Sequence, residues 1–164
     1  MQKAAVVVIQ AAEGYFELGL LDEAANELEK LEDRIAVQVW ASRLKIFSRA
    51  GRWDAALDVA KHLVARVPHE VESWLLAANA ARHAQSVEAA YMLLRLANGY
   101  HADSPMIQYR LACYESQLGN FATATENLRS AVLQLPSLKH TAIQEPDLQP
   151  LWDNFGMNQP WQKE

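Results

Sequence analysis

The chain has 164 residues, of which 51% are hydrophobic and 21% charged, a composition typical of folded rather than disordered proteins. Its formal net charge of −5 argues against nucleic acid or an anionic membrane surface as a partner. The single cysteine, Cys113, excludes a disulfide within the chain, and no apolar stretch approaches the roughly 20 residues of a membrane-spanning helix. We therefore expect a cytoplasmic protein that binds neither nucleic acid nor membrane.

Four segments of the chain, taken in order, share one residue pattern. Each segment begins at a turn position, and these positions are Gly19, Gly51, Gln85 and Gly119. A bulky apolar residue follows two positions later, and these residues are Leu21, Trp53, Val87 and Phe121. An alanine follows five positions after each turn, at separations of 32, 34 and 34 residues, and these are Ala24, Ala56, Ala90 and Ala124. Self-similarity at this period indicates a helical repeat.

Each repeat is expected to be a pair of antiparallel helices joined at the turn position. The predicted helix ranges are 3–18 and 21–32, 35–50 and 53–66, 70–83 and 86–99, and 104–118 and 121–135. Glycine permits the unusual backbone angles of a tight turn, and the alanine lets the two helices approach closely. Large residues such as Trp40 and Trp74 are expected to fill the space between repeats, because a single helix pair cannot bury its apolar face.

The repeat pattern ends near Pro136. A shorter helix is expected from Ser137 to Gln144, because Pro146 would stop it. The stretch after this helix is interpreted as a cap over the apolar face of the last repeat, and its apolar residues are Leu148, Leu151, Trp152 and Phe155.

This set of positions resembles the tetratricopeptide-repeat (TPR) family over roughly residues 5–138. The resemblance implies an all-α, right-handed solenoid of four helix-turn-helix repeats, at about 5–34, 37–70, 71–104 and 105–138. A C-terminal capping segment is expected over residues 139–155 and a flexible tail over 156–164. The departures from the family's pattern are Gln85 in place of the turn glycine, and Gln108 and Glu115 at apolar positions.

In the TPR family the first helix of each repeat lines a concave surface where peptides bind, and the resemblance implies the same role for matching positions here. The predicted peptide-binding residues are Lys45, Arg49, Leu75, Asn79, Arg82, Met106, Tyr109 and Arg110. The cations would make the middle of the groove basic, Asn79 would hydrogen-bond an extended backbone, and the apolar side chains would contact an apolar residue. The expected partner is a protein or peptide with an acidic residue or a C-terminal carboxylate. Basic residues on a solvated helix face can also serve solubility alone, and that alternative stays open.

One branch of the family binds chaperone tails by clamping a C-terminal carboxylate with lysine, asparagine and arginine at set positions. The corresponding positions here hold Ala41, Lys45, Leu76, Met106 and Arg110. Only Arg110 matches, so an adaptor for chaperone tails is disfavoured.

No residue pattern points to catalysis, and we expect no catalytic residue, no cofactor and no metal site. The five histidines show no metal-ligand spacing. Cys113 could act as a nucleophile with His83 as its base if both lined the groove. A small cysteine packed inside a helix is the simpler interpretation.

The leading functional hypothesis is an interaction scaffold that binds a peptide or protein segment in the concave groove. The alternative is a dedicated chaperone for secreted substrates, as in type III secretion, and an enzyme is a remote third. The N-terminal helix adds a homodimer hypothesis, because residues 4–9 are apolar on every side. A terminal repeat normally shows a polar face to water, so this helix is a candidate for packing against a second copy or a partner.

Overall fold

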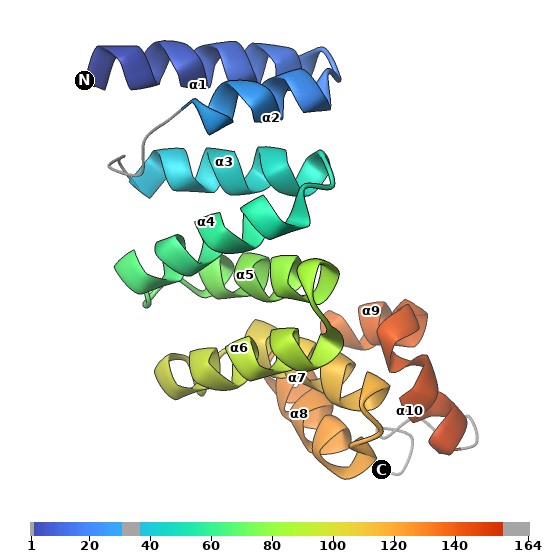
Figure 1. Cartoon of the computed structure of the whole chain (residues 1–164). Helices are drawn as coiled ribbons and strands as arrows, with labels where there is room; N and C mark the ends of the chain where they lie inside the picture. The colour runs from blue at the N-terminus through green and yellow to red at the C-terminus, as the bar shows by residue number, and fades with distance from the viewer. Residues whose placement is uncertain (1, 31–36, 156–164) are drawn as a thin grey trace.

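The computed structural model describes the backbone of residues 2–30 and 37–155, and the side chains of residues 6–30 and 40–155. These residues form helices and turns, with no β-strand among them (Figure 1). The helices of the repeats are α1 (Gln2–Glu17), α2 (Leu21–Glu29), α3 (Val37–Arg49), α4 (Trp53–Arg66), α5 (Val71–Ala84), α6 (Val87–Tyr100), α7 (Pro105–Gln117) and α8 (Phe121–Gln134).

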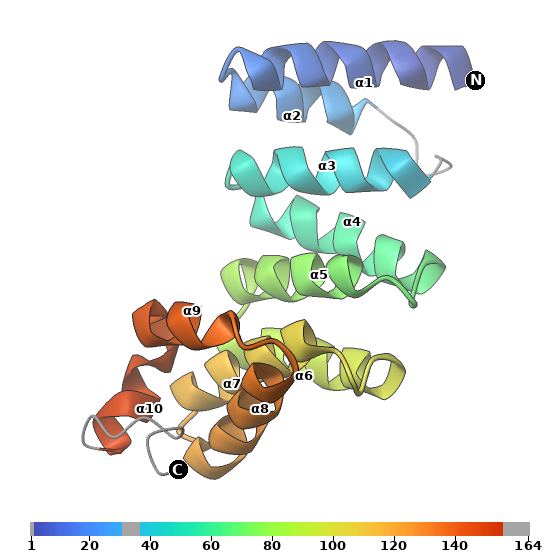
Figure 2. The same cartoon turned by 180° about the vertical axis from the view of Figure 1, so that it is seen from behind.

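The eight helices form four pairs that stack one on the next (Figures 1 and 2). Within each pair the two helices pack against each other, and α4 and α6 also pack against the first helix of the following repeat. The helix α4 has the bounds predicted from the sequence, and the other helices begin or end within a few residues of theirs. The predicted helical solenoid of four helix pairs is therefore confirmed.

The turns within three of the repeats use glycine in the left-handed region of backbone space. Gly19, Gly51 and Gly119 have φ angles of 75°, 71° and 76°, which other residues rarely adopt. The third repeat differs, because Gln85 has a φ of −130°. There, Ser86 caps the next helix by accepting a hydrogen bond from the Ala89 amide at 3.2 Å. The departure from the glycine pattern thus changes one turn and leaves the helix pair in place.

The core follows the repeated alanines. Ala24, Ala56, Ala90 and Ala124 are all fully buried at the contact between paired helices. One apolar cluster runs through the first three repeats into one side of α7 and includes Trp40 and Trp74, both buried as predicted. A second cluster joins the rest of α7 and α8, with Ala124, to residues 138–152. The apolar core is therefore divided in two at α7, and the second part is shared by the fourth repeat and the residues that follow it.

The C-terminal segment, residues 138–155, contains α9 (Leu138–Gln144), η1 (Pro146–Leu148) and α10 (Gln149–Asn154). Leu148 and Leu151 are fully buried, and the Trp152 indole donates to the Ala142 carbonyl at 3.2 Å. The expected cap thus forms, although Phe155 is 36% exposed and contributes little to it. The predicted tail, 156–164, lies outside the described residues.

None of the helices within the described ranges is long and apolar enough to cross a membrane.

Candidate functional site

The first helices of the repeats, α1, α3, α5 and α7, are neighbours along one face of the stack. The predicted groove residues lie on three of them. Lys45 and Arg49 are on α3, whereas α5 and α7 carry the remaining ones, Leu75, Asn79, Arg82, Met106, Tyr109 and Arg110. The structure divides these residues into two groups with different surroundings.

The first group forms what we call the open half of the groove, made of Glu13, Phe16, Lys45 and Arg49. Lys45 Nζ lies 5.1 Å from the centre of the Phe16 ring, and Arg49 Cζ lies 5.7 Å from it. Both cations are exposed, while Phe16 is half-buried. Two cations four residues apart on one helix share a face, and the ring beneath them attracts both electrostatically. The result is an apolar floor with positive charge above it.

The second group forms the occupied half, where the C-terminal segment supplies acidic partners. Arg82 makes a two-pronged ion pair with Asp147, in which one guanidinium nitrogen donates at 2.8 Å. Gln117 donates to the same carboxylate at 2.6 Å. The bond with Asp147 raises the pKa of Arg82, and the Asp147 residue is only 6% exposed. The predicted peptide-binding cation is therefore bound to the chain's own acid.

A second acid on the same segment engages α7. Arg110 forms an ion pair with Glu145 at 3.5 Å, and the Tyr109 hydroxyl donates to the same carboxylate at 3.4 Å. Tyr109 is almost fully buried, and this burial raises the pKa of its hydroxyl, which stays protonated as a donor. The residues Glu145 and Asp147 therefore neutralise both arginines of this half.

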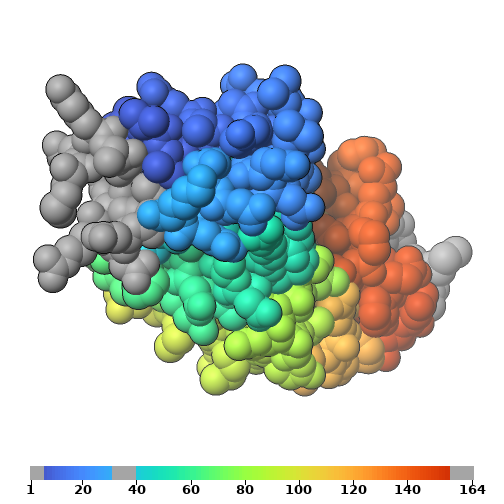
Figure 3. Space-filling view, turned by 45° about the horizontal axis from the view of Figure 1, so that its top comes forward, coloured from blue at the N-terminus to red at the C-terminus, as the bar shows by residue number. Residues whose placement is uncertain are grey.

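Apolar burial also holds the C-terminal segment in place. Leu138, Leu148, Leu151 and Trp152 are buried, and the Leu151 amide donates to Ser116 Oγ at 3.1 Å. Burying one large apolar side chain contributes about 1.5–3 kcal/mol, so four contribute roughly 6–12 kcal/mol. A ligand that displaced the segment would have to expose these side chains to water. Figure 3 shows the segment, in orange and red, standing out on one side of the repeat stack.

The remaining predicted residues have mixed roles. Leu75 and Met106 are half-buried and pack against the first and second apolar clusters, respectively. Asn79 is exposed on α5. Much of the apolar surface expected to meet a peptide therefore belongs to the core.

The environment of Cys113 disfavours the nucleophile hypothesis. The thiol is fully buried, and this burial raises its pKa to about 12. A thiol with such a pKa is protonated at neutral pH and reacts poorly. The ring of His83 stacks instead on Trp53, at 4.1 Å between centres. Among the described residues, no group of three or more His, Cys, Asp or Glu side chains could hold a metal ion.

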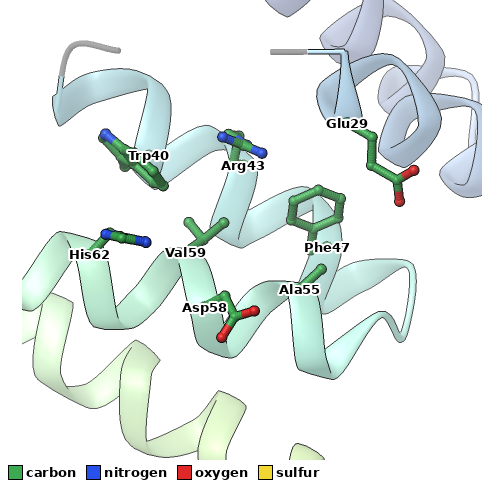
Figure 4. Close-up of a pocket in the computed structure, with 8 residues that line it drawn as sticks. All are labelled: Glu29, Trp40, Arg43, Phe47, Ala55, Asp58, Val59 and His62. Atoms are coloured by element: carbon green, nitrogen blue, oxygen red, sulfur yellow. The ribbon is translucent and has the colours of Figure 1, made fainter. Parts of the chain in front are cut away.

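A pocket of about 490 Å³ lies elsewhere, between the first and second repeats (Figure 4). Its lining residues come from α2, α3 and α4 and are Glu29, Trp40, Arg43, Phe47, Ala55, Asp58, Val59 and His62. His62 faces Trp40 at 5.1 Å between ring centres, and Arg43 lies 5.3 Å from the Trp40 ring. Both acids and bases rim this pocket, so its charge selects no single class of ligand.

The acidic partners inside the groove were missed by sequence reasoning. The stretch from Glu145 to Phe155 was interpreted from its apolar residues alone, as a cap. The available signal was charge, since Glu145 and Asp147 flank Pro146 in a segment that follows a basic groove. Those two acids indicate that the segment could neutralise basic residues of the groove, but not which arginine each acid meets.

Stacked helix pairs whose first helices line a common face, with glycine turns and buried alanines, define a repeat protein of the TPR fold. Comparison with known structures confirms this fold. A crystal structure of MamA protein superposes with a TM-score of 0.73 at 17% identity, over 96% of this chain and 85% of that one. MamA from Desulfovibrio magneticus RS-1 gives a TM-score of 0.68 at 15% identity, over 81% and 76%.

A thermophilic TPR protein from Thermus thermophilus, TTC0263, gives a TM-score of 0.62 at 18% identity, over 93% of this chain and 84% of that one. At these identities the likeness concerns the fold. No protein-family model matches the chain, and no curated protein matches its sequence.

Proposed function

We propose that this protein is an interaction scaffold that docks a segment of a partner protein against the open half of its groove. The observation that carries the proposal is the position of Lys45 and Arg49, which are both exposed above the ring of Phe16. Two cations over one aromatic ring suit a ligand that combines an anion with an apolar group. The TPR fold supports the proposal in general, since a concave helical face suits an extended segment.

The partner's chemistry follows from the same surface. An acidic residue or a C-terminal carboxylate would pair with the two cations, and a neighbouring apolar residue would cover Phe16. Affinity of micromolar order is expected, because an extended segment loses conformational entropy when it binds. Exposed charges are screened over about 8 Å at physiological ionic strength, so binding should weaken as salt is added.

The test is affinity capture from the native cell followed by mass spectrometry. The bait is the wild-type chain, beside the double variant Lys45→Glu and Arg49→Glu and a matched double variant, Lys61→Glu and Arg129→Glu. Lys61 and Arg129 are exposed on α4 and α8, which are second helices of their repeats. Loss of the partner from the first variant alone would support the proposal. Equal capture by both variants would place binding on another surface.

A dedicated chaperone for secreted substrates would use the same kind of groove. The acidic net charge and the small size of the chain are what favour it as the second candidate. The two functions differ in the state of the partner. A scaffold binds a folded partner through one segment, whereas a chaperone holds its partner unfolded, so hydrogen exchange of the captured partner separates them. Enzymatic function stays a remote third candidate, and the buried, protonated thiol of Cys113 gives it no support.

The N-terminal helix is proposed as a second interaction surface. Val6 is 50% exposed and Val7 63% exposed on α1. Apolar β-branched residues are poor choices for a solvated helix, so a second copy or a partner covering them would be favourable. Sedimentation of the wild type and of Val7→Glu at tens of micromolar tests the homodimer. If both samples were strictly monomeric, the homodimer hypothesis would be wrong.

A further inference from the structure

We infer that the groove accepts a segment with one acidic side chain rather than an acidic run, and that this segment enters only the open half. The inference rests on the proposed function and narrows its partner. Two features of the structure carry it: a fixed internal occupant in one half, and a pair of acids beside the cations in the other.

The occupied half is closed to a partner by the chain itself. Asp147 satisfies Arg82 and Gln117, and Glu145 satisfies Arg110 and Tyr109. A competing acid would have to break these contacts and also expose the buried leucines of η1 and α10. The C-terminal segment therefore acts as a fixed wall of the groove.

The internal occupant also shows how acids are recognised on this face. Each of its carboxylates is a side chain within the chain, and each meets one arginine plus one neutral donor. The open half offers Lys45 and Arg49 within one helical turn, so one side-chain carboxylate can lie between them. A side-chain acid within a segment is therefore the expected guest.

Negative charge beside the open half limits the guest to a single acid. Glu13 lies on α1, where its carboxylate accepts a hydrogen bond from Ser42 of α3 at 3.4 Å. Glu17 follows four residues later on α1 and is also exposed. Residues four apart on a helix share a face, so both acids lie on the side of α1 that Glu13 presents to α3, the helix of Lys45 and Arg49. A second acid on the guest would meet repulsion there, whereas a neutral or apolar residue would lie on Phe16 without it.

Two end-blocked, fluorescently labelled octapeptides test the inference by anisotropy. One contains a single glutamate among leucine, alanine and serine residues, and the other contains four consecutive glutamates. The single-acid peptide should bind the wild type at least as tightly as the four-acid peptide, although it carries fewer charges. Lys45→Glu with Arg49→Glu should weaken its binding at least tenfold. Glu13→Gln should improve binding of the four-acid peptide more than that of the single-acid peptide.

The occupied half is tested with Asp147→Asn and with Glu145→Gln, each of which removes one acid of the C-terminal segment. Glu145→Gln serves as the second variant in case Asp147→Asn does not fold. Because the buried leucines keep the segment in place, saturating either peptide on the wild type or on these variants should leave hydrogen exchange of the Leu151 amide, which donates to Ser116 Oγ, as slow as in the free protein. Faster exchange of that amide when a peptide binds would show a displaceable segment and overturn the inference.

Two further outcomes would also overturn it: tighter binding of the four-acid peptide by the wild type, and no binding of the single-acid peptide. Neither outcome would contradict the proposed function, because that function is tested separately, by whether capture of the native partner requires Lys45 and Arg49.

Discussion

Arg82 of α5 and Asp147 of η1 lie 65 positions apart in the chain and form a two-pronged ion pair. The contact joins the third repeat directly to the C-terminal segment that follows the fourth repeat. It also brings a buried carboxylate onto the concave face, where every charged residue of the predicted peptide-binding set is a cation. One side-chain pair thus connects the stability of the C-terminal segment with the shape of the groove.

Asp147→Asn should destabilise the protein, because the amide leaves Arg82 without its anion and places a donor near Gln117. Removing one partner of a buried charged pair costs about 3–5 kcal/mol, and partial exposure of the Arg82 side chain reduces this to roughly 2–3 kcal/mol. Urea unfolding measures the change. The control is Asp153→Asn, on the exposed side of α10, where the acid accepts from Gln149 at 2.7 Å. Equal losses in the two variants would show that the ion pair adds nothing.

The repeat core was predictable because it depends on local spacing. Ala24, Ala56, Ala90 and Ala124 recur at a nearly constant period, and each must be small where two helices touch. The glycine turns follow equally from local backbone geometry. Neither inference requires knowing which distant residues meet.

Ala124→Leu should overpack the contact between α7 and α8 and cost about 1–3 kcal/mol of stability. Ala124 is fully buried, whereas Ala122 on the same helix is exposed. Ala122→Leu is therefore the matched control, and it should change stability by less than about 0.5 kcal/mol. Thermal and urea unfolding of the two variants give the comparison. Unchanged unfolding of Ala124→Leu would contradict the tight helix contact.

The occupied half of the groove was not predictable in the same way. Arg82 and Arg110 were placed on the concave face by their position in the repeat, and the structure puts them beside Glu145 and Asp147. The repeat period locates the small and apolar residues of the core, but it does not locate ion pairs between residues this far apart in the chain. Only the arrangement of the C-terminal segment in space reveals which acid meets which arginine.

Two glycine substitutions should change stability in opposite directions. Gly119 has a φ of 76°, so Gly119→Ala forces a strained backbone and should cost about 1–2 kcal/mol. Gly99 is the last but one residue of α6, and no atom would contact an added methyl group within 4 Å. Gly99→Ala should therefore stabilise the helix by up to about 0.5 kcal/mol, less than at a position in the middle of a helix. Urea unfolding measures the change in stability of both variants. If Gly119→Ala also stabilised the protein, the turn would not require the positive φ of glycine.

Glu115→Gln should stabilise the protein at pH 7. Glu115 is 3% exposed, and burial raises the pKa of its carboxyl, although hydrogen bonds from Asn127 and Thr123 oppose the shift. An acid with a raised pKa in the folded state favours folding when protonated, and this stabilisation is lost as pH rises through the folded pKa. At pH 7 the carboxyl of the unfolded wild type is charged, so folding bears the cost of either burying that charge or protonating it. Glutamine carries no charge and can still accept from Asn127, whose amide donates to Glu115 at 2.8 Å.

The advantage of Glu115→Gln should shrink as the pH falls toward about 4, the ordinary range of a glutamate, because the wild-type carboxyl then takes up its proton. Urea midpoints measured from pH 7 to pH 4 follow this change. Glu126→Gln, at an exposed position on α8, is the matched control and should show a much smaller difference across the range. If Glu115→Gln were instead less stable at pH 7, the hydrogen bonds from Asn127 and Thr123 would outweigh burial. The charged carboxylate would then stabilise the contact between α7 and α8.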